Sequence, residues 1–136
     1  MTVGTRLRDE RGLMGKLAII WLLVLAVLVV AAVDAGSIAI ARFKVENAAD
    51  KAAFQAASEY KESRDRAKAF QAAQDVVEQD VPDAKIPANG FTIDTQTGDV
   101  TVKVVDKAWS LVAGRLSYTR DYTKIGATST SQPPTF

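Results

Sequence analysis

Residues 17–33 read LAIIWLLVLAVLVVAAV, and this stretch decides the fold. It holds 17 consecutive residues without a charge. At about 1.5 Å per residue a helix of this length covers roughly 26 Å, and from Leu13 onward it reaches about 30 Å, the thickness of a bilayer's hydrocarbon core. A small globular domain cannot enclose a helix that is apolar on every side. The stretch therefore predicts a membrane-spanning helix. Its lipid-facing anchor residues are expected to be Leu17, Ile20, Trp21, Leu25, Val29 and Val33.

Charges on either side of this stretch predict its orientation. Residues 1–16 carry four basic and two acidic side chains, whereas residues 42–136 carry 13 of each. By the positive-inside rule the basic tail stays in the cytoplasm and the long neutral part is exported. We therefore expect a single-pass protein of the cytoplasmic membrane, with a loose cytoplasmic tail over residues 1–16, its N-terminus inside and its C-terminal part extracytoplasmic.

A cleaved secretory signal peptide is the alternative for the same stretch. The small residues of Ala39-Ile40-Ala41 fit a signal peptidase site. The apolar run is longer than the usual 7 to about 15 residues, however, and Asp34 would lie between it and the cut. The anchored interpretation is therefore favoured.

Asp34 ends the apolar run and has two interpretations. It is either a helix-end charge in water at the membrane boundary, or a contact with a neighbouring subunit, since carboxylates within a bilayer often mark a function or a partner.

Residue types that carry chemistry are scarce. The chain has no cysteine and no histidine, which excludes disulfides, thiolate and imidazole metal sites, and Ser-His or Cys-His catalysis. Asp94 and Asp99 flank a glycine but are too few for a calcium loop. The four basic residues of the tail serve topology rather than nucleic-acid binding. We therefore expect no enzyme activity, no catalytic residue, no metal, no cofactor and no nucleic acid.

Residues 37–80 favour helix, because they are rich in alanine and contain no proline or glycine. We expect the span and its outer extension over residues 17–41, followed by a helical stalk over residues 42–81 with a bend or break within residues 60–67. One stripe of this helix carries small residues at spacings of three and four, which indicates a packing face for the chain's own sheet or for another subunit. The stripe comprises Val45, Ala48, Ala49, Ala52, Ala56 and Tyr60.

The pattern changes to a period of two beyond Pro82 and Pro87. Residues 91–95 and 100–104 alternate apolar and polar side chains around the turn residues 96–99, which predicts a β-hairpin. Residues 108–116 have helical spacing and predict a short amphipathic helix, in which Trp109 packs on the sheet or dips into the membrane surface. Residues 118–131 predict a third strand. The fold class is therefore α+β, a long N-terminal helix followed by a small antiparallel β domain over residues 82–136.

The order of several motifs supports a family resemblance. The span ends in Ala32-Val33-Asp34-Ala35-Gly36, Arg42 follows, and residues 46–53 read ENAADKAA. This order resembles the TadE/TadG-like proteins of the tight-adherence (Flp) pilus assembly system. Prepilin peptidase substrates carry a glutamate at the fifth mature position, where this chain has Leu17 or Ile20. We therefore expect the span to stay uncleaved.

The resemblance implies a membrane-anchored minor pilin-like or pseudopilin-like component that assembles or anchors a type IV-like adhesion or secretion pilus. Its partners would be the lipid bilayer, other pilin-like subunits and pilus assembly platform proteins, in a hetero-oligomer in the membrane or at the cell surface. The alternative is a single-pass extracytoplasmic adaptor or sensor unrelated to pili. The motif and subunit-packing residues implied are Asp34, Gly36, Arg42, Asn47, Ala48, Ala49, Asp50, Ala52 and Ala56.

Overall fold

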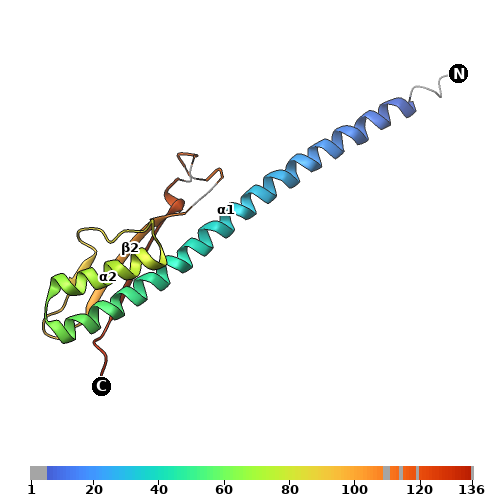
Figure 1. Ribbon diagram of the computed structural model, residues 1–136. Helices are drawn as coiled ribbons and strands as arrows, with labels where there is room; N and C mark the ends of the chain where they lie inside the picture. Colours follow the sequence, from blue (N-terminus) through green and yellow to red (C-terminus); the bar gives the residue numbers. More distant parts are fainter. Residues whose placement is uncertain (1–5, 109–110, 114, 119, 136) are drawn as a thin grey trace.

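The computed structural model describes residues 6–108, 111–113, 115–118 and 120–135. Its elements are α1 (Arg6–Ser63), α2 (Arg66–Asp80), β1 (Phe91–Ile93), β2 (Val100–Lys107), the 3-10 helix η1 (Arg120–Thr123) and β3 (Lys124–Ser131). The first half of α1 projects away from a small domain that contains all the other elements (Figure 1). The predicted α+β class, a long N-terminal helix with a three-stranded antiparallel sheet, is confirmed.

Helix α1 is longer at its start than expected. It begins at Arg6, so the prediction of a loose tail is wrong from this residue onward. Once the apolar stretch has formed a helix, each further turn adds hydrogen bonds without a new nucleation cost. This propagation carries the helix through Gly12 and Gly15, although glycine disfavours helix.

A break between α1 and α2 reverses the direction of the chain. Arg64 has a φ of 54°, in the left-handed region that ends helices. Asp65 then caps α2 by accepting the Ala67 N–H at 2.8 Å. The predicted break within residues 60–67 is confirmed, and α2 returns alongside α1 so that Lys51 Nζ lies 2.7 Å from Asp80 Oδ2.

The sheet has the order β1-β2-β3 with both pairs antiparallel. Phe91 pairs with Val102 and Val100 pairs with Ser131. The predicted hairpin is confirmed, and its turn contains Gly98 at a φ of 82°, a value that glycine adopts without strain. The third strand begins at Lys124 rather than at residue 118, because the 3-10 helix η1 comes first.

The predicted short helix over residues 108–116 is wrong in the part of that range the structure describes. Residues 111–113, 115 and 116 form bends and turns, and Trp109 lies outside the described residues. One helical turn is present, in which the Arg115 and Leu116 N–H groups donate to the Val112 carbonyl. Two causes limit it: the sequence places a glycine at position 114, and the amides of Leu111, Val112 and Ala113 donate to a carboxylate on α1.

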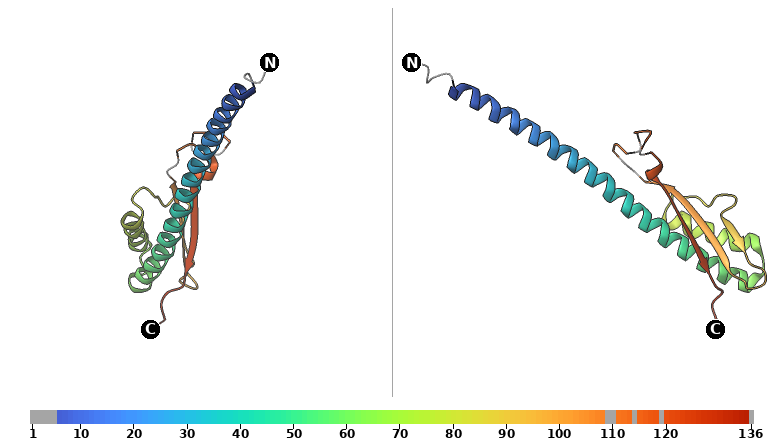
Figure 2. Two further views of the ribbon diagram at one scale, coloured as in Figure 1. Left: turned by 90° about the vertical axis from the view of Figure 1, so that its right-hand side faces the viewer. Right: turned by 180° about the vertical axis from the view of Figure 1, so that it is seen from behind.

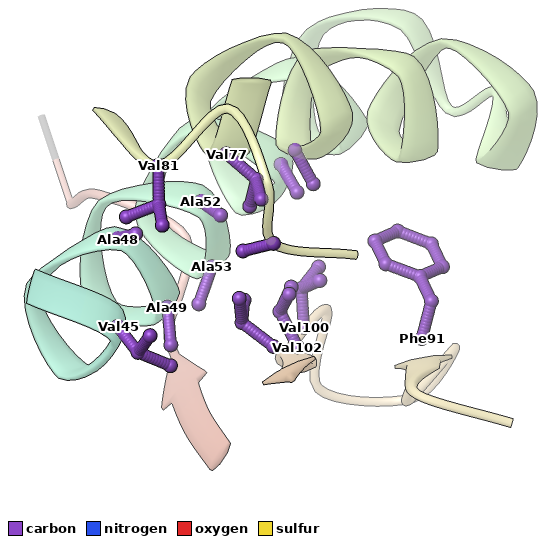
Figure 3. Close-up of a cluster of buried hydrophobic side chains, with 14 of the residues drawn as sticks. Val45, Ala48, Ala49, Ala52, Ala53, Val77, Val81, Phe91, Val100 and Val102 are labelled. Atoms are coloured by element: carbon purple, nitrogen blue, oxygen red, sulfur yellow. The ribbon is translucent and has the colours of Figure 1, made fainter. Parts of the chain in front are cut away.

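The core lies where the second half of α1 packs against α2, β2 and β3 (Figure 2). Alanines dominate its helical side and valines its sheet side (Figure 3). Phe70 and Phe91 close one end of it as an edge-to-face pair with ring centroids 5.2 Å apart. Because alanine side chains are small, the backbones of the two helices and the sheet approach closely.

Candidate functional site

The family-motif residues of α1 divide between two faces of the helix. At 3.6 residues per turn, Asp34 and Ala52 lie on one face, whereas Gly36 and Asp50 lie on the opposite face. The first face, here called the inner face, points into the folded domain. The second, the outer face, is exposed, and its Asp50 lines a shallow groove with residues 126–128 of β3. The two faces have different surroundings.

The inner face is fully occupied by the chain itself. Ala48, Ala49, Ala52 and Ala56 are 0% exposed, and they pack in the core with Val45 (Figure 3). These alanines therefore have no surface left for another subunit in this conformation. Their smallness serves the close approach of α2 and the sheet.

The outer face carries a stripe that the folded domain leaves open. The outer stripe, as we call it, consists of five exposed residues: Gly36, Phe43, Asn47, Asp50 and Phe54. They follow one another in steps of seven, four, three and four, so they lie along one side of the helix. The Phe43 side chain is 66% exposed and that of Phe54 is 52% exposed. Large aromatic side chains in this state, repeated along one face, are typical of an interaction surface.

Gly36 stands at the start of the outer stripe with open space around it. A Cβ added there would meet nothing within 4 Å. The chain's own packing therefore does not require a glycine at this position. In membranes such small residues allow a second helix to approach the backbone closely.

Arg42 lies on α1 between the two faces and is exposed. With Glu46, one turn further on, it lines a shallow groove of about 560 Å³ whose other walls are apolar. Those walls are Ala35, Ile38, Ala39 and Phe43.

Asp34, on the inner face, binds a loop from the distant end of the chain. Its Oδ1 accepts the Leu111 N–H at 2.6 Å, and its Oδ2 accepts the Val112 and Ala113 N–H groups at 3.0 Å each. The residue is 7% exposed. Three amide donors around one carboxylate stabilise its ionised form. Neither interpretation of Asp34 from the sequence anticipated this contact, and a separation of 77 residues leaves no local signal that could have revealed it.

The loop held by Asp34 lies beside the apolar part of α1 (Figure 1). Together they line a groove of about 620 Å³. Asp34 supplies its charged wall, and the remaining walls are apolar. Those walls are Leu23, Ala26, Val27, Val30, Ala31, Ala35 and Ile38 from the helix, with Val112, Ala113 and Leu116 from the loop.

On the N-terminal side of Asp34, the predicted anchor residues of α1 are exposed. Within the described residues, α1 is the one helix that is long and apolar enough to cross a membrane. The side chains of Leu17, Ile20, Trp21, Leu25, Val29 and Val33 are 42–67% exposed. The protein fold does not cover this apolar surface, which fits a single-pass membrane anchor.

The carboxylates of the described residues do not group into a metal site, and one of them organises a turn. Among the described residues, no three carboxylates group closely enough to hold a metal ion. Asp94 instead organises the hairpin turn, where its Oδ1 accepts the Gln96 N–H at 2.8 Å. Its carbonyl accepts the Gly98 N–H at 2.7 Å.

A family model described as "Putative Flp pilus-assembly TadE/G-like" matches residues 12–59. This range of helix α1 is similar to TadE/G-like proteins. The resemblance that the sequence motifs indicated is confirmed by this match. No curated protein and no solved structure matches the chain.

The TadE/G-like range holds both the apolar span and the outer stripe, and it ends within α1, before α2 and the sheet. The description of the family model links this range to Flp pilus assembly, and the range contains the helix that is long and apolar enough to cross a membrane. It is a family of pilus-assembly components rather than a known class of enzyme.

Proposed function

We propose that this protein is a minor pilin-like component, anchored in the cytoplasmic membrane, that helps to assemble or anchor a Flp pilus. The observation that carries the proposal is the outer stripe, an exposed aromatic and polar surface within the TadE/G-like range of α1. In this proposal the component contacts other pilus subunits along its helix. The stripe is available for this contact because the folded domain occupies only the inner face.

Charge supports the proposed orientation. The N-terminal 16 residues have a net charge of +2, from four basic and two acidic side chains, whereas the domain side is neutral. The positive-inside rule then places the N-terminus in the cytoplasm and the folded domain outside it. In this orientation the outer stripe begins at the membrane boundary with Gly36 and continues outward to Phe54.

The proposed contact combines two kinds of packing. Near the membrane, Gly36 and the exposed Ala32 one turn before it let a neighbouring helix approach closely. Further out, Phe43 and Phe54 supply large apolar surfaces, and such aromatic side chains commonly carry most of the binding energy of an interface. Asn47 and Asp50 lie between them and add polar contacts that set the register. The partners would be other pilin-like subunits or platform proteins of the pilus.

Site-specific photo-crosslinking tests the proposal. A photoreactive phenylalanine analogue is placed at position 43 or 54 of the full chain in cells that assemble the pilus, with Gln71, exposed on α2, as the matched control position. We expect crosslinks to pilus subunits or platform proteins from positions 43 and 54 and none from position 71. Crosslinks to non-pilus membrane proteins alone would favour an adaptor or sensor and contradict the proposal.

A filament count supplies the functional half of the test. The double substitution Phe43→Ser and Phe54→Ser should reduce surface filaments while the variant and the major pilin accumulate normally. Gln71→Ser should leave filaments unchanged. Normal filaments on cells with the double variant would argue against the outer stripe as an assembly surface.

A further inference from the structure

The loop held by Asp34 carries an apolar surface that the domain does not cover. This 111–118 loop comprises the described residues 111–113 and 115–118. Leu111, Val112 and Leu116 are 40%, 43% and 53% exposed, and Tyr118 is 89% exposed. Exposed apolar side chains gathered on one loop commonly mark an interaction site.

The Asp34 contact fixes the level of this loop relative to the membrane. If residues 13–33 of α1 fill the hydrocarbon core, which takes about 20 helical residues, Asp34 stands at its boundary on the side of the domain. The amides of Leu111, Val112 and Ala113 are bonded to Asp34, so the start of the loop lies at this boundary.

The apolar groove shows on which side of the boundary the loop continues. Val112, Ala113 and Leu116 share this groove with Leu23, Ala26, Val27 and Val30, all of which belong to the apolar stretch. The loop therefore faces the membrane-spanning part of α1, on the N-terminal side of the sheet (Figure 1). A groove of about 620 Å³ with almost entirely apolar walls is unfavourable in water.

Five amides of the loop have hydrogen-bond partners, which lowers the cost of bringing this backbone close to hydrocarbon. Unpaired backbone polar groups are costly in hydrocarbon, and irregular backbone does not occur exposed to lipid there, so the loop backbone stays at the membrane boundary. The Leu111, Val112 and Ala113 amides donate to Asp34, and the Arg115 and Leu116 amides donate to the Val112 carbonyl. Each of these five donors is therefore satisfied within the chain.

We propose that the 111–118 loop inserts shallowly into the bilayer leaflet next to the domain, with lipid acyl chains filling the groove between the loop and α1. The Leu116 and Val112 side chains reach into the edge of the hydrocarbon, while the loop backbone stays at the boundary. The exposed Arg115 reaches the anionic phosphates of the lipid headgroups, as long cationic side chains do at membrane boundaries. Tyr118 lies at headgroup level, where tyrosine is enriched. The domain is thus held against the membrane at a second point besides the span.

Single cysteines offer a direct test, because the chain has none of its own. Leu116→Cys and Tyr118→Cys are each spin-labelled in the full chain in vesicles of phosphatidylethanolamine and phosphatidylglycerol. Thr95→Cys, in the exposed hairpin turn, is the matched control. The collision rates of the label with oxygen, which partitions into lipid, and with a water-soluble nickel chelate are compared.

The expected result is oxygen-rich, nickel-poor exposure at position 116, intermediate values at 118, and full nickel access at 95. Adding Asp34→Ala should shift position 116 toward nickel access, since the loop loses its attachment. Nickel access at 116 and 118 equal to that at 95 would overturn the proposal. So would shielding of position 116 from both reagents that disappears on dilution in lipid, because this pattern means that another protein copy covers the groove.

Discussion

In the second half of α1, the inner face buries small apolar side chains, whereas the outer face leaves large apolar side chains exposed. Alanine, the smallest apolar side chain, fills the inner face at Ala48, Ala52 and Ala56, all 0% exposed. The larger Phe43 and Phe54 stand on the outer face, more than half exposed. Apolar character alone would bury the phenylalanines first.

On α1, burial depends on how closely the backbones of α2 and the sheet approach the helix, and not on the apolar character of its side chains alone. The helix lies between α2 and the sheet, and only small side chains let backbones come this near on both sides (Figure 2). Large apolar side chains are left on the outer face, where they are available to other molecules. The following predictions test this division, beginning with the largest expected effect.

A charge on the inner face should unfold the domain. Ala52→Asp places an unpaired carboxylate at a fully buried position, which costs about 4 kcal/mol or more. Limited proteolysis of the full chain in detergent micelles should then cleave the domain rapidly.

Phe54→Asp is the matched outer-face control for this change. The same charge placed in water should alter the free energy of unfolding by less than about 0.5 kcal/mol. Equal protease sensitivity of the two variants would contradict the division into faces.

Removing Asp34 and removing Asp50 should affect amide hydrogen exchange differently, and this effect is smaller than that of the buried charge. Asp34→Ala removes the acceptor of three amides, whereas Asp50→Ala removes an exposed carboxylate on the outer face. Hydrogen exchange of the Leu111, Val112 and Ala113 amides should rise on the order of tenfold in Asp34→Ala, because opening of the loop no longer breaks hydrogen bonds to a charged group.

In Asp50→Ala the same three amides should exchange at the rate of the unaltered chain. Unchanged exchange in Asp34→Ala would show that other contacts hold the loop. The rest of the domain should keep its protection in both variants, since neither aspartate belongs to the cluster of buried hydrophobic residues.

The smallest effect on the free energy of unfolding is expected for Lys51, which lies on α1 between the two faces. Lys51 pairs with Asp80 at 2.7 Å, but the two side chains are 64% and 27% exposed. Exposed ion pairs of this kind contribute about 0.2–1 kcal/mol and are screened by salt. Lys51→Met should therefore lower the free energy of unfolding slightly at low salt and hardly at all at about 1 M salt. A loss of stability that persists at high salt would mean that Lys51 stabilises the domain by packing rather than by charge.

Lys44→Met is the control, because Lys44 is also an exposed lysine of α1.

Several elements of the fold could be predicted from the sequence because their signals are local. An uncharged run over residues 17–33 needs a nonpolar environment whatever the rest of the chain does. The break near Arg64 and the hairpin around Gly98 follow from short-range propensities and turn residues. The start of α1 and the described part of the range 108–116 differ from the prediction, since helix propagation and hydrogen bonds to a distant carboxylate override local propensity.

The sequence by itself determined the membrane-length helix, the break after it, the alternation of the strands and the motif order of the TadE/G-like range. Only the tertiary structure decided which face of α1 each motif residue occupies and what Asp34 binds. Helical periodicity divides residues into faces, but it does not say which face the domain covers. The return of α2 and the sheet onto the alanines made that choice, and it brought the amides of residues 111–113 to a carboxylate at the end of the span. Long-range contacts of this kind depend on packing that no local pattern records.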